Sequence, residues 1–126
     1  MFQVFYSVTI IWMFINSTVL MSGADYFDDG FAINAYMDSS LKVNVDQAKK
    51  EHSEIKTALE KAGVKVIKVA PPYGCQDGVY TANWGLCKGD TVVMSSLPNK
   101  RKSEEPYAQK VLSNLGKRLV FVPDGL

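Results

Sequence analysis

The sequence predicts an α/β fold in which short strands form mixed sheets and two helices pack against them. Two segments, residues 44–62 and 103–116, carry apolar residues at the three- and four-residue steps of an amphipathic helix. Short runs rich in valine, isoleucine and other apolar residues stand before, between and after these helices. The resulting order is strand, helix, strand, strand, strand, helix, strand, which is typical of mixed α/β proteins.

Length and composition set limits on function. The chain has 126 residues, of which 47% are hydrophobic and 21% charged, so we expect one ordered domain with a modest core. The formal net charge of +1 supplies no field for nucleic acid or an anionic membrane surface. The basic residues 100–102 are followed after one serine by two glutamates, which argues against a phosphate-binding patch. We therefore expect a small-molecule ligand and no nucleic acid partner.

The cysteine and histidine content gives little support for a metal site. Cys75 and Cys87 have a spacing that matches no metal-binding or redox motif, and His52 is the single histidine. We expect two reduced thiols in a cytoplasmic chain without a bound metal. The alternative is a disulfide between Cys75 and Cys87.

Residues 1–17 form an apolar N-terminal extension. No charged residue precedes Asp25, and the block is long enough for a membrane helix or a signal sequence. It lacks a basic residue in front, however, and its aromatic and β-branched composition suits a buried strand as well. Cleavage at residues 22–24 would remove residues 18–21, the first predicted strand. The segment is therefore interpreted as a membrane anchor, an extension, or residues translated from a wrong start, ahead of a domain over 18–126.

The first helix follows a polar and aromatic loop over residues 22–41. Asn44 and Gln47 form a capping-box pair at the start of the helix, and Gly63 lies just past its end. His52 falls on the apolar stripe of this helix, where a half-buried structural histidine is the expected role and a catalytic one the alternative. The next run, residues 64–69, alternates as a strand and leads into a proline turn.

The stretch over residues 76–86 carries the candidate site. Asp77 belongs to a turn, residues 79–81 are predicted as a strand, and Asn83 follows. The separation of Asp77 from Asn83 is even, so an extended backbone would place both side chains on one face, with the aromatics Tyr80 and Trp84 on either side of Asn83. That arrangement suits a small polar ligand. The alternative is an ordinary turn and a polar residue that ends a strand.

The C-terminal third is predicted to contain a hairpin, a helix and a strand. Residues 88–90 form a hairpin turn, and residues 91–94 the returning strand. After a loop, Ser103 is the natural N-cap of the second helix, and Gly116 ends it. Residues 118–122 are the last predicted strand.

Three motifs in this order resemble a known family. They are Asp77 with Tyr80-Thr81-Ala82-Asn83 and Gly85-Leu86, then Ile33-Asn34-Ala35-Tyr36-Met37, and Ser103-Glu104-Glu105-Pro106-Tyr107. Together they resemble the guanidine-modifying hydrolases, which include dimethylarginine dimethylaminohydrolases, arginine deiminases and arginine dihydrolases. The resemblance covers about residues 18–126. It implies the pentein fold, an α/β-propeller of five ββαβ modules, of which about two would lie in this chain.

The resemblance also implies substrate contacts. Asp77 would accept the substrate's amino group, Arg101 would bind its carboxylate, and Asn83 stands where the family places a guanidinium-binding residue. By the same match, Asn34 would contact the amino-acid end and Phe27 would wall the pocket. From the residues alone, each has a structural alternative: a solvated Arg101, a core Phe27 and a turn-capping Asn34. Asparagine at position 83, where deiminases have aspartate, favours a dihydrolase or a dimethylarginine-type hydrolase.

The family's catalytic groups have no match in this chain. Its members use a cysteine thiolate, a histidine and an acid, and no cofactor. Neither His52 nor either cysteine lies in a setting like theirs. We therefore expect a substrate-binding part that is inactive alone and is completed by a missing C-terminal half or a second chain. The alternatives are a non-catalytic module for arginine-like ligands, anchored through residues 1–15, and a gene fragment with unpaired strand edges.

Overall fold

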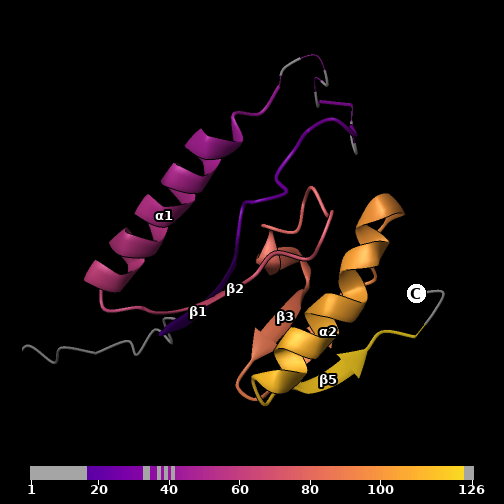
Figure 1. The fold of residues 1–126 in the computed structure, drawn as a ribbon. Coiled ribbons are helices and arrows are strands. Elements are labelled where there is room, and N and C mark those ends of the chain that lie inside the picture. Colours follow the sequence, from indigo (N-terminus) through magenta and orange to yellow (C-terminus); the bar gives the residue numbers. More distant parts are fainter. Residues whose placement is uncertain (1–16, 33–34, 37, 39, 41, 124–126) are drawn as a thin grey trace, which may run out of the picture.

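The computed structural model describes residues 17–32, 35–36, 38, 40 and 42–123 as five strands, two α-helices and two short 3₁₀ helices (Figure 1). In chain order these are β1 (Thr18–Ser22), α1 (Val45–Lys61), β2 (Lys65–Val69), η1 (Thr81–Asn83), β3 (Gly85–Lys88), β4 (Thr91–Met94), η2 (Asn99–Glu104), α2 (Glu105–Asn114) and β5 (Arg118–Phe121). The predicted α/β class is confirmed, and the order of strands and α-helices matches the prediction, although the third strand is Gly85–Lys88 instead of residues 79–81.

The first structural unit is the strand–helix–strand segment β1–α1–β2. Its two strands pair in parallel, from Thr18 opposite Lys65 to Ser22 opposite Val69. The N-cap of α1 is Asn44, whose side chain accepts a hydrogen bond of 3.0 Å from the backbone N–H of Gln47. Gly63 has a φ of +84°, the left-handed conformation that commonly ends a helix. The predicted N-cap and the glycine at the C-terminal end are therefore confirmed, whereas the side chain of Gln47 donates to Glu51 Oε1 at 2.8 Å in place of completing a capping box.

Helix α1 lies against its own sheet without burying any residue completely. The half-buried stripe runs through Val45, Ala48, His52 and Leu59, at helical spacing. Ile55, an apolar residue three positions after His52 that the helical spacing would place on the same stripe, is 55% exposed. The stripe is thus narrower than the sequence pattern indicates.

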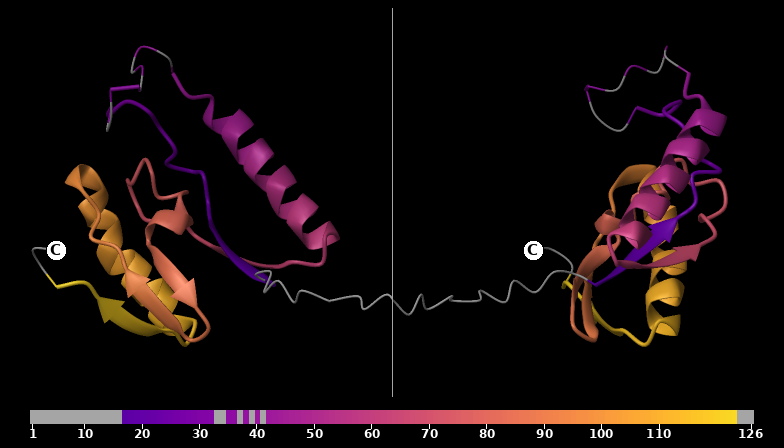
Figure 2. Two further views of the ribbon diagram at one scale, coloured as in Figure 1. Left: turned by 180° about the vertical axis from the view of Figure 1, so that it is seen from behind. Right: turned by 90° about the vertical axis from the view of Figure 1, so that its left-hand side faces the viewer.

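The second unit, β3–β4–α2–β5, has the ββαβ order. Strand β3 pairs antiparallel with β4, with Gly85 opposite Met94, and β4 pairs in parallel with β5 across helix α2. The connection from β3 to β4 is the predicted tight turn, in which Gly89 has a φ of +56°. Both ribbon views show that each α-helix stays beside the sheet of its own unit (Figure 2).

The strand predicted over residues 79–81 does not form. The chain instead makes successive turns, with hydrogen bonds from Gly78 N–H to Cys75 C=O and from Tyr80 N–H to Asp77 C=O, and then enters η1. Strand β3 begins only at Gly85. Because the backbone is turned rather than extended, the prediction that Asp77 and Asn83 share one strand face is wrong.

The start of the second helix also differs from its prediction. Helix α2 begins at Glu105 after η2, and its N-cap residue is Glu104. Ser103 does not cap α2, because its hydroxyl donates a 2.8 Å hydrogen bond to Lys100 C=O inside η2. The predicted end of the helix before Gly116 is confirmed.

One apolar core lies between the three-stranded sheet and α2. Its buried members are Trp84, Val92, Met94, Leu97, Ala108 and Leu112. Leu20 of β1 packs against this core, and Thr81 donates a 2.9 Å hydrogen bond to Leu20 C=O. These contacts join the first unit to the second.

Within the described residues, no helix is both long and apolar enough to cross a membrane. The segment predicted as an anchor, extension or wrong start lies outside the described residues, apart from Ser17.

Candidate functional site

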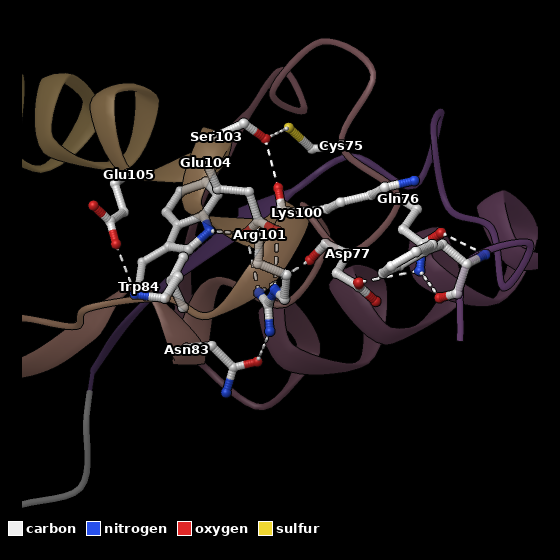
Figure 3. A network of polar contacts seen from close by, with 12 residues as sticks. Cys75, Gln76, Asp77, Asn83, Trp84, Lys100, Arg101, Ser103, Glu104 and Glu105 are labelled. Atoms are coloured by element: carbon white, nitrogen blue, oxygen red, sulfur yellow. Dashed lines mark hydrogen bonds and ion pairs between the residues drawn. The ribbon is translucent and has the colours of Figure 1, made fainter. Parts of the chain in front are cut away.

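Arg101 of η2 is the centre of a polar network (Figure 3). Its Nε and Nη2 donate to the two carboxylate oxygens of Glu104, at 2.9 and 3.0 Å. Its Nη1 donates to Asn83 Oδ1 at 2.8 Å, and Nη2 also reaches the backbone oxygen of Asp77 at 3.4 Å. The guanidinium therefore connects η2 with η1 and with the turn that carries Asp77.

Glu104 holds this guanidinium from a buried position. It is 1% exposed, and a buried carboxylate needs several donors to offset its lost hydration. Besides Arg101, the indole Nε1 of Trp84 donates to Glu104 Oε2 at 3.0 Å. The hydrogen bonds to Glu104 raise the pKa of Arg101 above its usual range, with burial opposing the shift. Arg101 is thus permanently charged, and its Nη1 donates toward Asn83.

Trp84 was predicted to flank a ligand-binding surface, and this prediction is wrong. The indole is 1% exposed and belongs to the core, with Tyr107 edge-on to it at 5.9 Å between ring centroids. Its polar contact is with Glu104. The other flanking aromatic, Tyr80, is 47% exposed.

The structure brings together three of the residues singled out by the sequence. Asn83 is exposed, whereas Asp77 is 4% exposed, and Arg101 links both of them. The Asp77 carboxylate accepts a 3.3 Å hydrogen bond from the side chain of Gln76. Their proximity arises through Arg101 and the turn, and not through alternation along a strand.

A cavity of about 660 Å³ opens beside this network. Asp77, Arg101 and Glu104 line it on the network side, and Tyr26 and Phe31 line it from the loop after β1. Cys75 and Ser103 also face it, with their Sγ and Oγ atoms 3.4 Å apart. Phe31 carries the ammonium of Lys100 over its ring, 3.9 Å from the centroid.

Phe27, the predicted pocket wall, does not line this cavity. It is half-buried and packs edge-on against Tyr80, with the ring centroids 5.9 Å apart. Neither Phe27 nor Asn83 is among the residues that line the cavity. Asn34, predicted to contact the amino-acid end of a ligand, lies outside the described residues.

The side chains with catalytic potential are dispersed. His52 is half-buried on α1, where burial and the positive charge of Lys68 lower its pKa and a hydrogen bond with the Ser22 backbone opposes this. Cys75 and Cys87 are free, the second of them exposed on β3. In the described part of the chain, no group of three or more His, Cys, Asp or Glu side chains could hold a metal ion.

Two contacts of this site carried no local sequence signal. Glu104 pairs with Trp84 across 20 positions, and Gln76 pairs with Phe31 across 45. Apart from its place in the motif over residues 103–107, Glu104 indicates a favourable charge near a helix start and no contact with Trp84. Gln76 indicates only a residue in a turn.

Comparison with known proteins gives consistent matches to arginine dihydrolases, although no family model matches the chain. The chain is 37% identical over 114 residues to the bifunctional arginine dihydrolase/ornithine cyclodeaminase ArgZ of Synechocystis sp., and 33% identical over 109 residues to AgrE of Nostoc sp., which is described in the same terms. These alignments cover 86% and 85% of this chain, but 16% and 15% of the relatives.

Solved structures of these two relatives are also similar to this chain. The N-terminal domain of ArgZ, crystallised with bound product, superimposes with a TM-score of 0.77 at 27% identity, covering 86% of this chain and 40% of that chain. A mutant of AgrE in complex with L-arginine gives a TM-score of 0.79 at 32% identity, covering 86% and 17% of the respective chains.

The fold and these matches define a protein homologous to part of an arginine dihydrolase domain. The chain belongs to the guanidine-modifying hydrolase, or pentein, family, as its three motifs indicated. It spans 16% of the length of ArgZ and 15% of the length of AgrE.

Proposed function

We propose that this chain is the N-terminal, substrate-binding part of a hydrolase that acts on the guanidino carbon–nitrogen bonds of arginine or methylarginine, and that it is inactive alone. The observation that carries the proposal is the 2.8 Å hydrogen bond from the Arg101 guanidinium to Asn83 Oδ1. The amide oxygen of Asn83 is thus placed to accept an N–H from a guanidinium, on a residue that is exposed. The similarity to arginine dihydrolases favours arginine as the ligand.

Ligand binding on this account requires Arg101 to move. The Nε hydrogen of Arg101 is donated to Glu104, and the two Nη2 hydrogens are donated to Glu104 and to the Asp77 backbone oxygen. One Nη1 hydrogen is donated to Asn83, which leaves a single Nη1 hydrogen for a ligand. Two parallel hydrogen bonds to a ligand carboxylate need one hydrogen each from Nη1 and Nη2, so Arg101 must release both Asn83 and the backbone oxygen of Asp77. Because that release also frees the Asn83 amide oxygen, one movement prepares both ends of the site.

The amide at position 83 sets the kind of head group that binds. It is a neutral group with one acceptor and one donor side, so it attracts a cation less strongly than a carboxylate does. The same amide suits the neutral ureido group of citrulline, where a carboxylate would lack a donor. We therefore expect the site to bind both arginine and citrulline, as an enzyme that converts arginine beyond citrulline requires.

The placement of the possible nucleophiles and bases supports the proposed inactivity. Nucleophilic attack on a guanidinium carbon needs a thiolate with a proton-transfer group nearby. Cys75 faces the cavity, but its close polar contacts are with Ser103 and with the Tyr73 backbone oxygen. His52 is on α1 and contacts the end of β1.

The test is isothermal titration of the whole chain with arginine, citrulline and dimethylarginine, alongside an ammonia-release assay. Asn83→Ala should abolish arginine binding, whereas Asn114→Ala, an exposed amide at the end of α2, should leave it unchanged. Equal binding by both variants, or no binding by the unaltered chain, would contradict the proposal. Ammonia release that is lost in Cys75→Ser or Cys87→Ser would show that the chain carries its own nucleophile.

A further inference from the structure

We propose that Gln76 is a positioning residue, which holds the loop over residues 26–32 at the edge of the cavity and orients the Asp77 carboxylate toward the ligand. The inference rests on the proposed function, because it assigns a role within the same site. Gln76 belongs to none of the contacts that the family resemblance implied.

The first step is the pairing between the Gln76 amide and the backbone of Phe31. Gln76 Nε2 donates to Phe31 C=O at 2.8 Å, and Phe31 N–H donates to Gln76 Oε1 at 3.1 Å. The side-chain amide therefore satisfies both backbone groups of one residue, in the manner of a neighbouring strand. The described residues show one further hydrogen bond from this loop to a residue outside it, the local bond from Phe27 N–H to Ala24 C=O at 3.2 Å, so the pair with Gln76 is what joins residues 26–32 to a distant part of the chain.

Ring contacts also hold this loop. Tyr26 contacts Tyr73 edge-on, with ring centroids 5.3 Å apart, and Phe27 contacts Tyr80. Lys100 covers the ring of Phe31. Such contacts tolerate sliding far better than a paired hydrogen bond does. Gln76 is therefore the group that fixes the position of this loop along the cavity wall.

The second step is the link from the same amide nitrogen to Asp77. Gln76 Nε2 also donates to Asp77 Oδ2 at 3.3 Å, so its two hydrogens serve the Phe31 backbone and the Asp77 carboxylate. Figure 3 shows Gln76 beside Asp77, with the dashed contact between them. Asp77 is 4% exposed and lines the cavity, and it is the proposed acceptor for a ligand amino group. A displaced loop would therefore also disturb Asp77.

The test uses Gln76→Ala, Gln76→Glu and the control Gln109→Ala on α2. Alanine removes all three hydrogen bonds, whereas glutamate keeps an acceptor for Phe31 N–H but cannot donate to Phe31 C=O and repels Asp77. The readouts are amide hydrogen exchange over residues 26–32 and titration with arginine and with its desamino analogue.

Both Gln76 variants should exchange about tenfold or more faster over residues 26–32, with α2 unchanged. The Kd of both Gln76 variants for arginine should rise about tenfold, which is equivalent to about 1.4 kcal/mol. The Kd for the desamino analogue should rise less, because that ligand has no amino group to bind Asp77. The control should match the unaltered chain in every readout.

The outcomes separate this inference from the proposed function. An unaltered chain that binds no arginine refutes the proposed function and the ligand-positioning role with it, while the exchange data still decide the loop contact. If the unaltered chain binds but exchange over residues 26–32 is the same in all variants, Gln76 does not hold the loop. Faster exchange with an unchanged Kd would show a purely structural contact and overturn the positioning role.

Discussion

Glu104→Gln should lower the free energy of unfolding more than any other substitution in the polar network that exchanges a single side-chain atom. In the unaltered chain, Arg101 and Trp84 donate hydrogen bonds to the two carboxylate oxygens of Glu104. Glutamine keeps one of these acceptors and replaces the other by an NH₂ group, which faces a donor. Removing one partner of a buried ion pair costs about 3–5 kcal/mol. The side chain of Arg101 is 10% exposed and can regain some water, so we expect the lower end, about 3 kcal/mol.

That loss is large for a chain of this size, because small domains are stable by about 5–15 kcal/mol in total. Urea unfolding followed by circular dichroism measures it, and Glu60→Gln is the matched control. Glu60 pairs with Lys56 at 2.7 Å, but its side chain is 45% exposed, so its loss should cost about 0.5 kcal/mol or less. Equal costs for Glu104→Gln and Glu60→Gln would refute the reasoning that burial makes the first pair indispensable.

Three further predictions concern local structure. Thr81→Val removes the 2.9 Å hydrogen bond to Leu20 C=O that joins the two units, and should lower the free energy of unfolding by about 1 kcal/mol in the same urea assay; an unchanged midpoint would contradict it. Asn44→Ala should cost about 1 kcal/mol and lower the helical signal, because Gln47 N–H loses its acceptor, and a neutral result would show that the cap is dispensable. Burial and Lys68 lower the pKa of His52 from 6.5, so its contribution to stability is present above that value and is lost as pH falls toward the lower folded-state pKa; His52→Gln should flatten this acid limb of the stability profile, and identical profiles would argue against the shift.

Local signals predicted most of the secondary structure. Asn44 and Gly63 mark α1 because capping and left-handed termination depend on the residues at the helix ends. The β4 strand followed from its β-branched composition and the glycine turn before it. These features need no information from distant parts of the chain.

The strand predicted over residues 79–81 failed because tertiary contacts override β-propensity there. Gly78 lies so close to Pro72 that an added Cβ would be 2.5 Å from the proline ring, which fixes a compact turn. Thr81 then uses its hydroxyl on Leu20 of another strand. Neither contact can be read from the local pattern of apolar residues.

For the candidate site, motif resemblance predicted more than periodicity did. It singled out Asn83, Asp77 and Arg101, which the structure brings into one network through contacts that strand alternation did not anticipate. Glu104 and Gln76, which hold this network in place, have partners far away in the chain. A single sequence carries no signal for such pairings, because they depend on how two units pack.

The most direct test of the central claim is a nuclear magnetic resonance titration of the ¹⁵N-labelled chain with L-arginine, following the side-chain signals of Arg101 Nε–H and the Asn83 amide. The account predicts that both signals shift together and saturate, because the ligand takes the place of Arg101 on Asn83. Saturable binding that leaves both signals in place, or no shift in any signal, would contradict it.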